Sequence, residues 1–215
     1  MNDNIKFFLK NWNSDLLMNE FKFVADEPVV IFNEWIKEAG AAELNNPNAC
    51  ALATADKFGK PSVRMVLLKG VDESGFIFYT NSESQKGVEL SQNPRASLCF
   101  HWKTLGRTVR VDGAVKKVTE EEANLYFESR DRASQIGAWA SQQSRELISR
   151  FELEKRIKKF TVKFEMEKVP RPKFWEGYRV LHERVEFWAE KSFRLHDRYV
   201  YIRSDSGWQT KWLYP

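Results

Sequence analysis

Short apolar runs, separated by polar turn residues, fill the first half of the chain and predict β-strands. The connections at 56–59 and 72–75 each end in glycine and are typical of hairpins. Because a parallel crossover needs about a dozen residues or more, these short links indicate antiparallel neighbours. A closed or nearly closed antiparallel barrel is therefore the expected architecture. The five predicted strands span 49–55, 62–69, 76–81, 96–102 and 107–117.

Helical patterns interrupt and precede these strands. An acidic first turn and Pro28 open a segment whose apolar residues recur at helical spacing, and Gly40 is expected to end it. Between the third and fourth strands, the segment 84–93 has room for one helix with Ser84 as its cap. The barrel is thus expected to carry helices as well as strands.

Further helices and strands follow the barrel core. Thr119 and Glu122 form a capping box that opens a helix to about residue 129. Ser149 opens another helix, which Pro170 and Pro172 are expected to end. Extended patterns return at 175–188, 197–203 and 208–213.

The division of the chain follows from these patterns. Residues 1–25 mix aromatic, polar and charged residues without a clear period, so we expect an N-terminal arm of uncertain order. Residues 26–215 are expected to form a single domain, mainly β with α-helical additions.

Composition narrows the function classes. A chain of 215 residues with 42% hydrophobic and 14% aromatic residues is typical of a globular protein. Its net charge of +4 permits a phosphate ligand or nucleic acid without requiring either. Cys50 and Cys99 lie in apolar runs without metal-ligand spacing, so they are interpreted as reduced core residues and no metal site is expected. The sequence carries no membrane-span or signal-peptide pattern, so a cytoplasmic location and no membrane partner are expected.

A cationic motif near the C-terminus points to an anionic ligand. The sequence Val-Glu-Phe-Trp at 185–188 is followed by Arg194, His196 and Arg198. If this run is extended, the period of two places all three on one strand face. They repel one another unless an anion lies against them, and guanidinium groups suit phosphate or carboxylate. A solvated edge strand with Asp197 as an internal partner fits the segment equally well.

Two other segments carry candidate phosphate ligands. No glycine-rich phosphate loop is present, so a nucleotide site would have to be built from side chains. Arg64 and Lys69 begin and end an apolar strand, where ordinary rim charges are the simpler interpretation from that strand alone. Tyr126, Arg130 and Ser134 are spaced i, i+4 and i+8, which forms a monophosphate clamp if one helix continues through them. Packing by the phenol and a surface role for the guanidinium remain the alternative.

Taken together and in order, these motifs resemble the pyridoxamine/pyridoxine 5'-phosphate oxidase family over roughly residues 28 to 215. The matching segments are Arg-x-Val-Leu-Leu-Lys at 64–69, Tyr-Thr-Asn at 79–81, the stretches 126–139 and 143–144, and the motif at 185–198. The resemblance implies an antiparallel FMN-binding split β-barrel flanked by helices. It also implies a homodimer with FMN at the subunit interface.

The resemblance assigns roles to individual residues. Arg194 and His196 would be the catalytic residues, facing the substrate ring. The substrate would be bound by Lys69, Tyr126, Arg130, Ser134, Arg194 and His196. FMN would be bound by Arg64, Met65, Val66, Leu67, Leu68, Lys69, Tyr79, Thr80, Lys86, Gln143, Ser144, Trp188 and Arg198.

The implied reaction belongs to vitamin B6 metabolism. A hydride passes from the C4' carbon of pyridoxamine or pyridoxine 5'-phosphate to flavin N5. The alcohol substrate gives pyridoxal 5'-phosphate directly, and with the amine substrate the resulting imine hydrolyses to pyridoxal 5'-phosphate and ammonia. O2 then reoxidises the flavin and yields hydrogen peroxide. The chain would thus be a flavoprotein oxidoreductase acting on the CH–NH2 group of its donor, with small-molecule partners and no nucleic acid.

Several positions depart from the family pattern. Gln85 stands where the family usually has Arg, Thr108 and Ala189 where it has Gln, and Trp212 where it has Arg. These changes leave open a divergent paralogue that binds FMN or pyridoxal phosphate with weak or no oxidase activity. A basic β-barrel that binds nucleic acid is the other class considered.

Overall fold

The computed structural model describes residues 25–215, so the predicted arm at 1–25 lies almost wholly outside the described residues. The helices are α2 (Pro28–Ala42), α3 (Gln85–Gln92), α4 (Glu120–Ser129), α5 (Arg132–Ala140), α6 (Arg150–Lys163) and a 3-10 turn (Ser192–Arg194). The strands are β1 (Ala49–Ala55), β2 (Pro61–Leu67), β3 (Gly70–Asp72), β4 (Gly75–Asn81), β5 (Arg95–Trp102), β6 (Arg107–Lys117), β7 (Trp175–Val180), β8 (Arg184–Ala189), β9 (Asp197–Ser204) and β10 (Gly207–Trp212).

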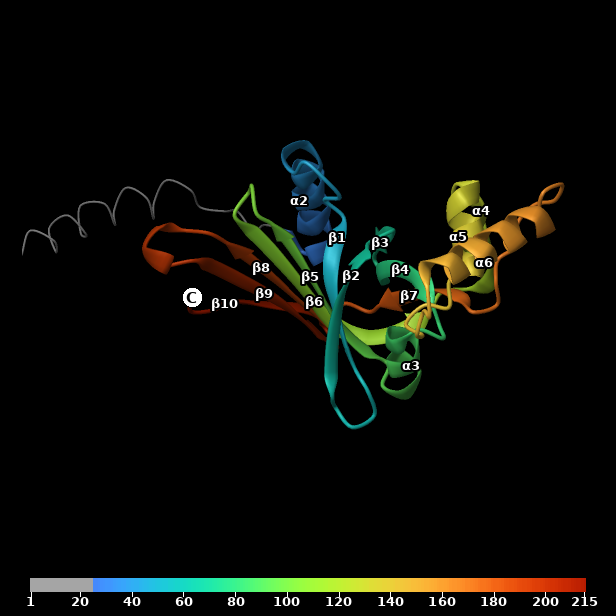
Figure 1. Cartoon of the computed structure of the whole chain (residues 1–215). Coiled ribbons are helices and arrows are strands. Elements are labelled where there is room, and N and C mark those ends of the chain that lie inside the picture. The colour runs from blue at the N-terminus through green and yellow to red at the C-terminus, as the bar shows by residue number, and fades with distance from the viewer. Residues whose placement is uncertain (1–24) are drawn as a thin grey trace, which may run out of the picture.

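The strands form one antiparallel sheet that forks at β6. One path runs β10-β9-β8-β6-β5-β1-β2, while β6 also pairs with β7, which leads to β4 and β3. The fork lies at Gly113, where an added Cβ would come within 1.6 Å of the Leu181 carbonyl oxygen, so only glycine fits there. The sheet curls into a half-barrel (Figure 1). The expected antiparallel barrel is confirmed in its split form.

The barrel core is built by alternation along the strands. In β5, every second side chain is buried, beginning at Ala96 and ending at Trp102. Helix α2 adds Phe32 and Trp35, which are buried against the sheet. The Phe32 ring lies 4.8 Å from that of Phe76 in an edge-on arrangement that aromatic pairs favour. This packing fixes one end of the half-barrel.

A second, smaller cluster holds the remaining helices. Helices α4, α5 and α6 group on the side of the sheet away from β9 and β10 (Figure 1). Their buried side chains meet β7 at Trp175, and Phe127 packs edge-on against that indole at 5.0 Å. The helical additions therefore stand beside one wall of the half-barrel.

Local boundaries differ from the sequence prediction in a few places. Helix α2 continues past Gly40 to Ala42, where the Glu43 N–H donates to the Ala39 carbonyl. Helix α6 ends at Lys163, several residues before the prolines expected to stop it, because Phe164 turns its side chain into the second cluster. The short strand β3 was not predicted.

Tyr126, Arg130 and Ser134 do not share one continuous helix, so the condition for a clamp along one helix face is not met. Helix α4 ends at Ser129, as predicted, and its C-cap residue Arg130 has an extended ψ of 151°. Asp131 then caps α5, with its side chain accepting a hydrogen bond from the Ser134 N–H. A carboxylate at this position favours a new helix start over continuation.

The run from Arg194 to Arg198 is not extended throughout, so the condition for a cationic row at Arg194, His196 and Arg198 is not met. Arg194 lies in the 3-10 turn with a left-handed φ of 62°, and the strand begins only at Asp197. The loop is closed by the Lys191 N–H, which donates to His196 Nδ1 at 3.2 Å. Of the three residues, only Arg198 belongs to a strand.

Among residues 25–215, no helix is long and apolar enough to span a membrane.

Candidate functional site

A cavity of about 590 Å³ opens between β2, β4, β7, α3 and the α4–α5 junction. Eleven of its fourteen lining residues are among the predicted site residues, although these eleven come from five separate stretches of the chain, 65–69, 79–80, 86, 126–134 and 143. The lining residues are Met65, Val66, Leu67, Lys69, Tyr79, Thr80, Lys86, Tyr126, Ser129, Arg130, Asp131, Ser134, Gln143 and Trp175.

Stacked aromatic rings form one wall of this cavity. The Tyr79 ring lies 4.2 Å from that of Tyr126 and 5.0 Å from that of Trp175, in both cases nearly parallel. Gly177 makes room for the stack, since an added Cβ there would lie 2.6 Å from the Tyr79 ring. Burial raises the pKa of the Tyr79 phenol, and the nearby Glu122 charge adds to this effect. The phenol therefore remains neutral at physiological pH.

Lys86 places a buried positive charge at the N-terminal end of α3. Lys86 is only 7% exposed, and its ammonium group donates hydrogen bonds to Ser84 Oγ at 3.3 Å and to Gln143 Oε1 at 2.8 Å. Burial lowers the pKa of Lys86, and the charge of Arg64 lowers it further. The hydrogen-bond partners of Lys86 are neutral, and the helix N-terminus also favours negative charge. An anion is the missing partner for this end of the cavity.

Arg130 places a second cation at the other end. Its guanidinium lies 5.1 Å from the Trp175 ring and 5.7 Å from the Phe127 ring. The Nη1 atom is buried and has no hydrogen-bond partner among the described residues. Burial lowers the pKa of Arg130, although arginine stays charged. A buried, unsatisfied guanidinium nitrogen costs free energy that a bound phosphate would recover.

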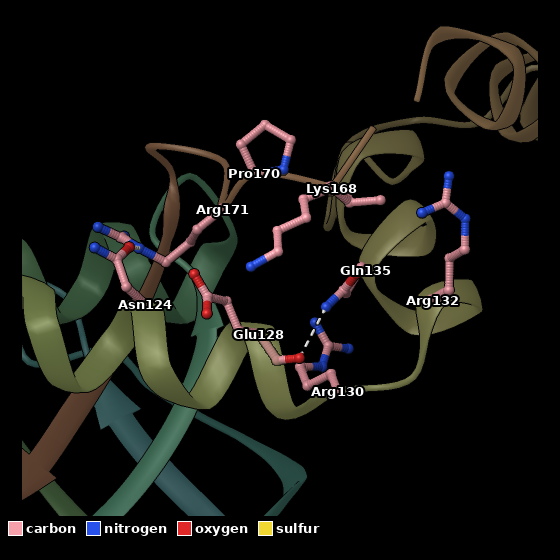
Figure 2. A pocket seen from close by; sticks show the side chains of 9 residues that line it. Asn124, Glu128, Arg130, Arg132, Gln135, Lys168, Pro170 and Arg171 are labelled. Atoms are coloured by element: carbon pink, nitrogen blue, oxygen red, sulfur yellow. Dashed lines mark hydrogen bonds between the residues drawn. The ribbon is translucent and has the colours of Figure 1, made fainter. Parts of the chain in front are cut away.

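Arg130 also borders a second hollow of about 520 Å³ on the other side of the α4–α5 junction. Figure 2 shows Lys168 reaching across it towards Glu128, with Arg132 at its edge. Arg132 is occupied by the α6 end, where it donates to the carbonyls of Phe164 and Glu167. This hollow therefore mixes charges of both signs, whereas the cavity that holds Lys86 is lined by three basic residues, Lys69, Lys86 and Arg130, and one acidic residue, Asp131.

Five predicted flavin ligands do not line the cavity: Arg64, Leu68 and Ser144, and the C-terminal residues Trp188 and Arg198. Leu68 is buried in the barrel core, and Ser144 lies beyond Gln143 with a left-handed φ of 69°. Arg64 donates to Thr54 Oγ1 and forms an ion pair with Glu89 at 3.3 Å. Its charge nonetheless affects the Lys86 pKa, so the two cations are close.

The C-terminal candidates gather at the opposite end of the sheet. The rings of Trp188 and His196 lie 4.6 Å apart. Arg198 donates through Nε and Nη2 to buried Glu186, at 3.0 and 2.8 Å. In Figure 1 this end, marked by β8 and β9, stands well apart from α4 and α5. Within one chain, Arg194 and His196 are therefore not brought together with Arg130.

Some functional positions were missed. Trp175, Ser129 and Asp131 line the cavity without having been singled out. Trp175 opens an extended run, and nothing in its spacing distinguishes a cavity wall from core packing. Glu89 and Glu186 hold predicted flavin arginines, and only the fold makes those pairings visible.

The departures from the family pattern also have structural settings. Gln85 donates to Glu89 Oε1 at 2.9 Å. Thr108 sits opposite Trp188 in the β6–β8 register, and Ala189 sits opposite Arg107. Both changes therefore lie at the β8 end of the sheet.

A curled antiparallel half-barrel whose cavity has a stacked aromatic wall and the basic side chains of Lys69, Lys86 and Arg130 is suited to phosphorylated, ring-containing small molecules. Residues 36–164 match the family "Pyridoxamine 5'-phosphate oxidase". Residues 175–215 match "Pyridoxine 5'-phosphate oxidase C-terminal dimerisation region". The chain belongs to the pyridoxamine 5'-phosphate oxidase family.

Similar proteins agree with this assignment. The chain is 56% identical over 194 residues to a pyridoxine/pyridoxamine 5'-phosphate oxidase of Rhodospirillum rubrum, covering 88% of this chain and 96% of the relative. It is 52% identical over 203 residues to a protein of the same name from Chelativorans sp., covering 94% and 97%. Among solved structures, PhzG from Burkholderia lata in complex with tetrahydrophenazine-1-carboxylic acid superposes with a TM-score of 0.86 at 33% identity, covering 93% of this chain and 98% of PhzG. An FMN-binding protein from Nostoc punctiforme, at 14% identity and a TM-score of 0.70 over 88% and 98% of the two chains, shares the fold.

Proposed function

We propose that this chain is an FMN-dependent oxidase that converts pyridoxamine 5'-phosphate and pyridoxine 5'-phosphate to pyridoxal 5'-phosphate. The observation that carries the proposal is a pair of cations, the buried Lys86 and the half-buried Arg130, that line one aromatic-walled cavity. Two phosphorylated ring compounds, one cofactor and one substrate, would satisfy both. Relatives above 50% identity that carry this activity in their names support the same assignment.

The donor set fits the FMN phosphate. Lys86 has only neutral partners, and Thr80 shares the Gln143 amide oxygen with it at 3.2 Å, so an incoming phosphate can take over these donors without displacing a carboxylate. Strand β2 would provide backbone along the flavin at 65–68, with Arg64 and Ser144 as additional ligands. When bound, FMN accepts the hydride and reacts with O2, and the protein binds and orients the reactants.

The substrate phosphate would be held by Lys69, Tyr126, Arg130 and Ser134. All four line the cavity on the side of the α4–α5 junction and β2. Charge-assisted hydrogen bonds from Arg130 and Lys69 fix the phosphate, and fixing one end of the substrate restricts where its reacting carbon can lie.

A homodimer would complete the site. Four predicted site residues near the C-terminus do not line the cavity of their own chain: Trp188, Arg194, His196 and Arg198. This C-terminal set is proposed to come from the partner subunit. Val63 and Met65 on edge strand β2 support an interface here, since these apolar side chains are 68% and 65% exposed next to the cavity. Residues 175–215, which match the dimerisation region, include the whole C-terminal set. Residues 26–215 are proposed to act as one domain.

Subunit mixing tests the shared site. With substrate kept well below the KM of the variants, Arg130→Ala and Arg194→Ala homodimers should each be nearly inactive in an oxygen-uptake assay. Mixing them by co-refolding should restore about a quarter of wild-type activity, because about half of the dimers are heterodimers and each holds one intact site of two. As a matched control, mixing Arg130→Ala with Lys69→Ala should restore none, since both changes affect the same half of the site. No recovery in the first mixture would contradict the interface site, and a wild-type protein that binds FMN without oxygen uptake on either substrate would contradict the oxidase.

A further inference from the structure

Glu89 is a buried carboxylate beside the proposed cofactor-phosphate site that the reaction does not use. It lies in α3, is 6% exposed and points to the start of the β1–β2 hairpin. Its Oε2 accepts hydrogen bonds from Thr54 Oγ1 at 2.5 Å and Ser62 Oγ at 2.6 Å. The same oxygen forms the 3.3 Å ion pair with Arg64.

Glu89 stays charged at any physiological pH. Burial alone would raise its pKa, but hydrogen bonds from Ser62, Thr54 and Gln85, together with the charge of Arg64, lower the pKa to about 2. The charge of Glu89 also raises the Lys86 pKa, opposing the effect of Arg64. A permanent negative charge therefore lies close to both cations that would bind the cofactor phosphate.

Position 85 explains why Arg64 carries this pairing. Residues 85 and 89 are one helical turn apart, so an arginine at 85 could pair with Glu89 directly. In this chain Gln85 offers only a neutral amide, which donates to Glu89 Oε1. Among the described residues, Arg64 is the only ion-pair partner found for Glu89. Arg64 is correspondingly turned to Thr54 and Glu89 and is absent from the cavity lining.

We infer that Glu89 competes with the cofactor phosphate for Arg64 and thereby sets the affinity of this protein for FMN. The inference rests on the proposed function, because it takes FMN as the ligand. A dianionic phosphate that reaches Arg64 must displace the Glu89 ion pair and also approach the Glu89 charge. Glu89 is thus an affinity-determining residue that acts through Arg64, and the neutral side chain of Gln85 leaves Arg64 as its ion-pair partner among the described residues.

The test measures dissociation constants of the flavin-free protein by quenching of flavin fluorescence, with FMN and with riboflavin, which lacks the phosphate. Glu89→Gln keeps an acceptor for Thr54 and Ser62 and removes the charge. We expect FMN to bind about 5- to 30-fold more tightly and riboflavin to be unchanged. In the Arg64→Met background, the same substitution should lose most of this gain, because the competition has been removed. Glu89→Ala serves as a second charge-free variant if Glu89→Gln does not fold, as judged by its melting curve.

The possible outcomes separate the ideas. The inference would be overturned if Glu89→Gln left the ratio of FMN affinity to riboflavin affinity unchanged or lowered it relative to wild type. Glu89 would then hold Arg64 in place for the phosphate and would not compete with it. If Glu89→Gln raised FMN affinity equally in the wild-type and Arg64→Met backgrounds, the proposed competition for Arg64 would be overturned as well. Wild-type protein that binds neither flavin would refute the proposed function itself, and the inference with it.

Discussion

Replacing Arg130 by methionine isolates the contribution of one guanidinium to substrate recognition. Methionine keeps the unbranched apolar stem that packs against Phe127 and Trp175. The fold loses the cation–π contacts of the guanidinium, which are worth about 0.5–2 kcal/mol. It loses no hydrogen bond from the buried Nη1, because this atom has no partner among the described residues. The substrate loses at least one charge-assisted hydrogen bond to its phosphate, worth about 1.5–3 kcal/mol. That free energy corresponds to about a 10- to 150-fold increase in KM.

The assay compares phosphorylated and unphosphorylated substrates in the same variant. Steady-state oxygen uptake with pyridoxine 5'-phosphate and with pyridoxine gives a ratio of kcat/KM values that reports recognition of the phosphate. The ratio should fall by the same 10- to 150-fold (about 1.5–3 kcal/mol) in Arg130→Met. Arg132→Met is the matched control, because Arg132 is two residues away but donates to the α6 carbonyls outside the cavity. An unchanged ratio in Arg130→Met, or an equal fall in both variants, would refute the assigned role.

Two further predictions concern the cofactor site and the C-terminal sheet. Burial and the charge of Arg64 hold the pKa of Lys86 below the ordinary lysine range. FMN affinity should fall as pH rises through this pKa, because only the ammonium form pairs with phosphate. Fluorescence titrations from about pH 7 to 11 should show this fall in wild type and not in Lys86→Met. Glu186→Ala should lower the free energy of unfolding in urea by about 2–4 kcal/mol, because the 2% exposed carboxylate side chain binds three partly exposed arginines. Glu83→Ala, which breaks an exposed pair, should cost under about 1 kcal/mol, and similar losses in the two variants would contradict this account. Because the Glu186 pKa is lowered on folding, its contribution is present above its ordinary pKa and should disappear as pH falls through the lowered value.

Features governed by neighbours in the chain could be predicted from the sequence. Alternation and turn residues placed β1 and β6 at the bounds that the structure has, 49–55 and 107–117. The capping box of Thr119 and Glu122 and the Ser84 cap are also present, each joining atoms within one helical turn. The family resemblance added the half-barrel and most of the cavity lining, because its motifs carry the order of the strands with them.

Features that depend on contacts between distant segments were decided only by the tertiary structure. Arg130 and Ser134 line one cavity across the break between α4 and α5, where Asp131 caps α5, and not along one helix face. Arg194 takes a left-handed conformation in a closed loop, which moves it off the strand row. Arg64 and Glu89 are 25 residues apart, so no local pattern reveals that they pair. Local periodicity fixes which residues share a strand or a turn, whereas the partner of a buried charge is fixed only when the sheet curls and brings separate segments together.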